Sequence, residues 1–96
     1  MIKKELIDQI AEETGFMPLD VRAVIQLALD KMIDALAEGD RIEIRDFGVF
    51  EIVKRRPRIG RNPNNPQQTY QVPARYVVRF KPGKMMKEKI DASQSA

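Results

Sequence analysis

The sequence contains no cysteine and no histidine. Their absence excludes disulfide bonds, thiolate and imidazole chemistry, and the usual ligand sets of zinc sites. Catalysis would have to rest on scattered carboxylates such as Glu43 and Asp46, with no activated nucleophile beside them. We therefore expect a protein that is not an enzyme and that needs neither a metal ion nor an organic cofactor.

Long apolar segments are also missing. The uninterrupted apolar runs are only a few residues long, whereas a helix needs about 20 consecutive apolar residues to cross a bilayer. The chain starts Met-Ile-Lys-Lys-Glu, and no apolar signal-peptide core follows this start. These two observations predict a cytoplasmic protein without a membrane partner.

Acidic residues are absent from one long stretch. Between Ile52 and Lys87 the chain has ten lysines or arginines and no aspartate or glutamate. Residues 1–51 carry a net charge of −6 and residues 52–96 a net charge of +9, so the overall +3 hides a local concentration of positive charge. A basic surface on an acidic body is typical of an oriented polyanion site. The alternative is a solvated charged loop, but such loops usually balance their charges.

Two amphipathic helices are predicted in the first half. Residues 3–14 place apolar residues at helical spacing, and Gly15 follows as a stop. A longer helix begins near Pro18 and runs to about Ala37, before Gly39. Its apolar residues cover more than one stripe, which the first helix alone cannot bury. Since a chain of this size builds only a thin core, we predict a dimer with a shared core, formed with an identical chain or with a related subunit.

Two short strands are predicted next. Residues 41–45 alternate strictly, with the isoleucines on one face and the charged residues on the other. Residues 46–48 turn the chain, and residues 49–53 resume as the second strand of an antiparallel hairpin. Phe47 and Phe50 are expected in the core. The charged face of the first strand is explained equally well by solvent and by a nucleic acid.

The basic stretch is predicted to form a two-stranded arm. Its prolines exclude a regular central strand, and they indicate edge ribbons that lean into solvent. Residues 62–68 would form the tip and residues 69–80 the returning strand, followed by a short helix from Lys84 to about Ile90. The predicted organisation is one α+β domain, 1–96, with a body (1–53 and 77–91), a β-arm (54–76) and a flexible tail (92–96).

A narrow basic ribbon suits a DNA groove, where guanidinium groups contact phosphates or enter the negatively charged minor groove. Pro63 at the tip either shapes the turn or acts as a wedge between base pairs. An RNA-binding or ribosome-associated module is the alternative. That module would stack bases on exposed aromatic residues, for which Tyr70 and Tyr76 are the candidates.

Three motifs resemble one known family. They are Gly39 to Phe50 (GDRIEIRDFGVF), Arg58 to Pro63 (RIGRNP) and Phe80 to Lys84 (FKPGK). Together they are similar to the bacterial histone-like HU and integration host factor (IHF) family, over nearly the whole chain. The resemblance implies an intertwined dimer with a helical base, an antiparallel sheet and protruding arms. It also implies a nucleoid-associated, architectural protein that binds duplex DNA in the minor groove, bends it and condenses it.

The resemblance further implies roles for single residues. Pro63 would intercalate between base pairs, the arm residues around it would line the minor groove, and further cations would hold the flanking phosphates. Residues 41–45 and 75–84 look closer to the beta subunit of IHF than to HU, which places Glu43 and Arg45 near DNA. The expected DNA-binding set is Lys3, Glu43, Arg45, Lys54, Arg55, Arg56, Arg58, Arg61, Asn62, Pro63, Arg75, Arg79, Lys81 and Lys84.

The sequence departs from the family pattern at two places. The tip reads Asn64-Asn65-Pro66-Gln67, where the family usually has a shorter turn that contains glycine, so we expect an apex about one residue longer. Position 46 is aspartate, where the family usually has glycine. This aspartate puts a negative charge beside the hairpin turn.

Overall fold

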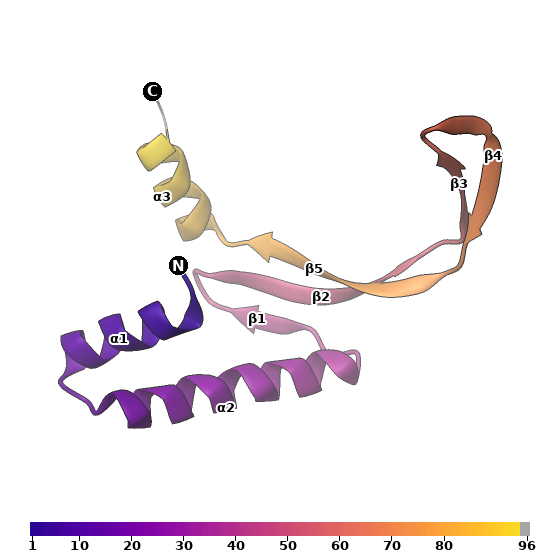
Figure 1. Cartoon of the computed structure of the whole chain (residues 1–96). Helices are drawn as coiled ribbons and strands as arrows, with labels where there is room; N and C mark the ends of the chain where they lie inside the picture. The colour runs from indigo at the N-terminus through magenta and orange to yellow at the C-terminus, as the bar shows by residue number, and fades with distance from the viewer. Residues whose placement is uncertain (95–96) are drawn as a thin grey trace.

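The computed structural model describes residues 1–94, which form two helices, five strands and a final helix (Figure 1). This arrangement confirms the α+β class. Within residues 1–94 the elements are α1 (Lys3–Thr14), α2 (Pro18–Ala37), β1 (Ile42–Ile44), β2 (Gly48–Arg55), β3 (Arg58–Asn62), β4 (Asn65–Val72), β5 (Arg75–Pro82) and α3 (Lys84–Gln94).

Local signals set the ends of the first two helices, as predicted. Gly15 adopts φ 77°, and its N–H donates to the Ala11 carbonyl at 2.9 Å, which closes α1. Pro18 occupies the first turn of α2, where a missing N–H costs nothing. Ile7 and Ala11 of α1 pack against Val21 of α2, and these three are the buried hydrophobic residues in the described part of the chain.

A three-stranded antiparallel sheet in the order β1-β2-β5 follows the helices. The predicted hairpin is confirmed, with Ile42 opposite Phe50 and Ile44 opposite Gly48. Strand β1 is shorter than expected and ends before Arg45, because Asp46 turns the chain with φ 66°. That left-handed conformation favours glycine. The departure from the family pattern at position 46 therefore falls on a strained backbone position.

Phe80 of β5 lies between the two phenylalanines of the hairpin. Its ring centroid is 4.7 Å from that of Phe50 and 5.7 Å from that of Phe47. Phe50 is half-buried, but Phe47 remains 46% exposed. The expectation that Phe47 is a core residue is therefore not met among residues 1–94, where Phe80 covers only one side of the ring.

Both strands of the arm break at the same level. Strand β2 gives way to β3 around Pro57, and β4 gives way to β5 around Pro73, so β3 and β4 form a separate two-stranded sheet. Figure 1 shows this hairpin turning sharply away from the line of β2 and β5. The expected continuous return over residues 69–80 was wrong, because proline offers no N–H to continue the ladder. We call this shared break, at residues 56–57 and 73–74, the hinge of the arm.

The irregularity of the tip lies in β4 rather than in the turn. Asn62 pairs with Asn65, so that the turn itself contains only Pro63 and Asn64. The register then shifts, because Arg61 pairs with Thr69. Residues 66–68 consequently form a bulge on the returning strand.

The last helix is longer than predicted. Helix α3 continues to Gln94 instead of ending near Ile90, because no glycine or proline interrupts residues 84–94. Residues 92–94 of the predicted tail, 92–96, belong to this helix, and residues 95–96 lie outside the described residues. None of the helices in residues 1–94 has the length and apolarity needed to cross a membrane.

One chain leaves an unusually large surface uncovered. Its accessible surface is 8599 Å², whereas a folded monomer of 11.0 kDa exposes about 5,600 Å². Its radius of gyration is 19.2 Å, whereas about 12.5 Å is usual for a compact chain of this length. The protruding arm accounts for part of this excess. Much of the remainder is apolar, including Leu29 on α2 and Ile90 on α3.

Candidate nucleic-acid interface

The predicted site residues occupy four regions. Residues 54–63 and Arg75 lie on the arm and at its hinge, Arg79 and Lys81 lie on β5 of the three-stranded sheet, and Lys3 and Lys84 begin α1 and α3. Glu43 and Arg45 lie on β1 and in the turn after it. The structure therefore brings most of the set onto the ribbon that β2–β5 and then β3–β4 form in Figure 1.

Four arginines converge at the hinge. Arg55 lies directly opposite Arg75 in the β2–β5 register, and with Arg56 and Arg58 these residues line a hollow of about 530 Å³. Like charges that face each other across a sheet are destabilising, and none of the four makes an ion pair within residues 1–94. A phosphate oxygen would relieve this repulsion. Arg75, expected among the flanking cations, thus belongs with the arginines of the arm.

The carboxylate of Glu51 holds two of the expected phosphate-binding residues. It accepts hydrogen bonds from Arg79 Nε at 2.9 Å and Arg79 Nη2 at 2.5 Å, and Lys81 Nζ lies at 3.2 Å. The hydrogen bonds from Arg79, and then from Lys81, lower the pKa of Glu51 below its usual value. The sequence analysis missed Glu51 because it lies one residue before the acid-free stretch. The signal for it is the register, since Glu51 faces Arg79 across the sheet.

The tip presents Pro63 to solvent between two short strands. Arg61, at the end of β3, is also exposed. Asn62 is half-buried, and both of its polar atoms make hydrogen bonds within the tip. Of the three, Pro63 and Arg61 are directly available to a ligand, whereas Asn62 is occupied by the tip itself.

The two tyrosines are less free than the sequence suggests. The ring of Tyr70 covers Gly60 across the β3–β4 ladder, and a Cβ atom at Gly60 would lie only 2.4 Å from this ring. Tyr76 faces Lys54, whose Nζ lies 6.0 Å from the ring centroid. Each ring therefore has a neighbour in the ribbon, while Tyr70 remains 56% and Tyr76 70% exposed.

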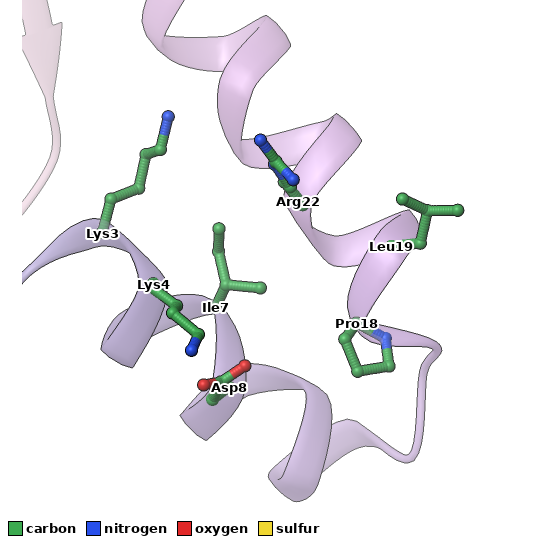
Figure 2. Close-up of a pocket in the computed structure, with 7 residues that line it drawn as sticks. All are labelled: Lys3, Lys4, Ile7, Asp8, Pro18, Leu19 and Arg22. Carbon is green, nitrogen blue, oxygen red and sulfur yellow. The ribbon is translucent and has the colours of Figure 1, made fainter.

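Lys3 lies beside a shallow cavity of about 400 Å³ between α1 and α2. Figure 2 shows Lys3 and Arg22 reaching from the two helices into the same space, with Ile7 projecting between them. Lys3 Nζ donates a hydrogen bond to Gln26 Oε1. The sequence analysis missed Arg22, because a lone arginine on a long helix reads as an ordinary surface residue.

Lys84 begins α3, where the helix leaves free N–H groups that favour anions. Its ammonium lies 3.9 Å from the Glu88 carboxylate, but the side chain is 89% exposed, so the contact holds it only weakly. Among residues 1–94, no group of three or more histidine, cysteine or acidic side chains is arranged to bind a metal ion. The candidate site among residues 1–94 is therefore a surface of lysine and arginine side chains that suits an anionic ligand.

Comparisons with known proteins agree on one family. The family model described as bacterial DNA-binding protein matches residues 1–91. The "Probable DNA-binding protein HU" of Chlamydia trachomatis is 52% identical over 91 residues, which covers 95% of this chain and 91% of the relative. The "Integration host factor subunit beta" of Azoarcus sp. is 46% identical over 92 residues and covers 95% of this chain and 97% of the relative.

A solved structure shares the whole architecture. HU from Anabaena, in a cocrystal with DNA, superposes with a TM-score of 0.85 at 37% identity, covering 94% of this chain and 97% of the Anabaena chain. The similar proteins thus include both branches named in the sequence analysis, with the higher identity on the HU side.

Proposed function

The chain belongs to the HU/IHF family of bacterial DNA-binding proteins, and on this basis we propose that it is a non-enzymatic, nucleoid-associated architectural protein. It binds duplex DNA as a dimer through the minor groove and bends it. The observation that carries this proposal is the ribbon. It extends from the sheet, carries eight of the ten cations of the acid-free stretch from Ile52 to Lys87, and ends at the exposed Pro63.

Pro63 is the proposed wedge. It lies at the turn between β3 and β4, is exposed, and has no N–H that would need a partner. This part of the mechanism is carried over from the HU and IHF family, which kinks DNA by inserting apolar side chains between base steps at a cost of a few kcal/mol per step. The arginines of the arm and hinge would offset that cost, because bending brings additional phosphates within their reach.

The proposed dimer follows from the uncovered apolar surface. On α2 the buried residue Val21 and the half-buried Ile25 begin a stripe at helical spacing that continues through Leu29 and Met32, and Leu29 remains 39% exposed. Helix α3 also exposes Ile90 and packs extensively on no other element among residues 1–94. A second chain that covers both surfaces would supply the core that one chain lacks.

Duplex DNA is favoured over RNA as the partner. Base stacking on RNA uses free aromatic faces, and this chain offers only Tyr70, 56% exposed beside Gly60, and Tyr76, 70% exposed and facing Lys54, among the tyrosines of the described ribbon. A regular A-form RNA helix also has a deep and narrow major groove and a shallow minor groove, which suit an inserted ribbon less well than the minor groove of DNA.

A competition experiment tests the proposed function. The purified chain is bound to a fluorescent DNA duplex, and unlabelled duplex DNA or structured RNA is added at equal nucleotide concentration. We expect the DNA to displace the labelled duplex at a much lower concentration than the RNA. Equal or better displacement by RNA would favour the RNA-binding alternative.

A further inference from the structure

The amide side chains of the tip form a short series of hydrogen bonds. The backbone N–H of Asn64 donates to Asn62 Oδ1 at 2.9 Å, and Asn62 Nδ2 donates to Gln68 Oε1 at 3.1 Å. These contacts join the turn to the bulge of residues 66–68, where the ladder is irregular. The tip is therefore held together by hydrogen bonds of its own side chains.

The orientation of both amides follows from the first of these bonds. A backbone N–H can only donate, so Asn62 must turn its oxygen toward Asn64. The amide nitrogen of Asn62 then faces Gln68, which must present its own oxygen. The Nε2 group of Gln68, with two N–H donors, is left without an acceptor among residues 1–94. The free end of the Gln68 amide that faces away from Asn62 is therefore its donor group, Nε2.

Donors beside the wedge distinguish base pairs in the minor groove. An A·T pair presents only acceptors there, adenine N3 and thymine O2, whereas a G·C pair adds the N2 amino group of guanine, which is a donor. A freely rotating amide could turn to suit either pair, but the bond from Asn62 holds Gln68 in one orientation. Its position in the bulge next to the turn keeps it close to Pro63 along the hairpin.

We propose that Gln68, oriented by Asn62, selects A·T over G·C base pairs beside the kink made at Pro63. This selection rests on the proposed function. In this assignment Asn62 is a positioning residue that acts through Gln68, while Gln68 contacts the base edge directly.

Inosine makes the test specific to the minor groove. Three duplexes differ only in the pairs beside a central mismatch, which fixes the kink because unstacking is cheapest there. The flanking pairs are A·T, G·C, or inosine·C, which equals G·C without the N2 amino group. We expect the wild-type chain to bind the A·T and inosine·C duplexes about five- to tenfold more tightly than the G·C duplex.

Three variants assign the effect to residues. Gln68→Ala should reduce the ratio between inosine·C and G·C to within about twofold. Asn62→Asp keeps an acceptor for Asn64 but removes the donor to Gln68. Gln68 should then turn its nitrogen inward and its oxygen outward, which abolishes or reverses the preference. Gln71→Ala, an amide removed three residues further along the same strand, should keep the wild-type ratio.

The outcomes separate this inference from the proposed function. Equal wild-type affinity for the inosine·C and G·C duplexes would overturn the selection by Gln68, and so would an unchanged ratio in Gln68→Ala. Tight binding of all three duplexes in those cases would leave the proposed function standing. Failure to bind any of the duplexes would overturn the proposed function and the selection together.

Discussion

Glu51 and Arg79 face each other across β2 and β5 and are joined by two hydrogen bonds, of 2.9 Å and 2.5 Å, to one carboxylate oxygen. The same oxygen lies 3.2 Å from Lys81 Nζ. One carboxylate thus orders two cations at the inner end of the basic ribbon. It also lowers the positive potential there in the free protein.

Replacing Glu51 by Gln should raise the affinity for DNA and lower the stability of the folded chain near neutral pH. Affinity for duplex DNA should rise about two- to fivefold at low salt, because no carboxylate then opposes the phosphates at Arg79 and Lys81. The pKa of Glu51 is lowered by Arg79 and Lys81. Its contribution to stability is therefore complete above the ordinary pKa of a glutamate and is lost as the pH falls through the lowered value.

Unfolding of the wild type and of Glu51→Gln, followed by circular dichroism from pH 7 to pH 3, checks this linkage. The wild type should lose more stability than the variant over the acid part of this range. Parallel curves for the two proteins would show that the carboxylate does not stabilise the folded chain.

Replacing Asp46 by Gly should stabilise the protein. Asp46 has φ 66°, a conformation that costs a residue with a Cβ atom about 1–2 kcal/mol and that glycine adopts freely. Glycine also makes the unfolded chain more flexible, which offsets about 0.5–1 kcal/mol of the stabilisation. We expect a net increase of about 0.5–1 kcal/mol per chain in the free energy of unfolding. Asp46→Ala is the control, which keeps the strain and should not stabilise. Denaturant titrations at one protein concentration measure the free energy of unfolding of both variants. If Asp46→Gly were less stable than the wild type, the backbone at Asp46 would not be strained.

Leu29 should be essential to the dimer. It continues the buried stripe of α2 but is 39% exposed in one chain, so Leu29→Asp would place a charge in the proposed shared core. We expect loss of the dimer and of cooperative unfolding. Light scattering and thermal melts test this against Ile59→Asp on the arm, where a still more exposed residue, at 71%, should tolerate the charge. A monomeric, folded wild-type chain would disprove the shared core.

Removing Arg58 and Arg61 together should weaken the salt dependence of DNA binding. Each lost phosphate contact makes the slope of log K against log salt concentration less negative by about 0.9, so the expected change is up to about 1.8 per chain. The double variant Lys31→Ala with Lys89→Ala removes the same charge from α2 and α3 and should leave the slope nearly unchanged. An unaltered slope in the arginine variant would mean that these residues do not contact DNA.

Features set by neighbouring residues could be predicted from the sequence. Gly15 and Pro18 act within one turn of chain, and the helix ends follow them. The hairpin at Phe47 and the projecting basic ribbon likewise follow from alternation and proline positions. The last turn of α3, beyond Ile90, was not predicted because the sequence there contains no glycine or proline that would mark the end of the helix.

Features that depend on register were not predicted. Glu51 meets Arg79 across 28 residues of chain, and the Arg55–Arg75 pair arises only once β2 and β5 are aligned. The bulge at Gln68 likewise required the pairing of Asn62 with Asn65. Each of these contacts depends on which residues face each other, and a one-residue slip would exchange the two faces of a strand.

The central claim is that Pro63 bends DNA as a wedge at the end of a basic arm, and the bend itself tests it most directly. Energy transfer between dyes at the two ends of a duplex should rise when the wild-type protein binds. With Pro63→Ala we expect most of this rise to be lost while affinity falls by less than about tenfold, because the arginine contacts remain. Pro66→Ala, in the bulge beside the turn, should bend DNA like the wild type. A full bend with Pro63→Ala at saturating protein would contradict the wedge.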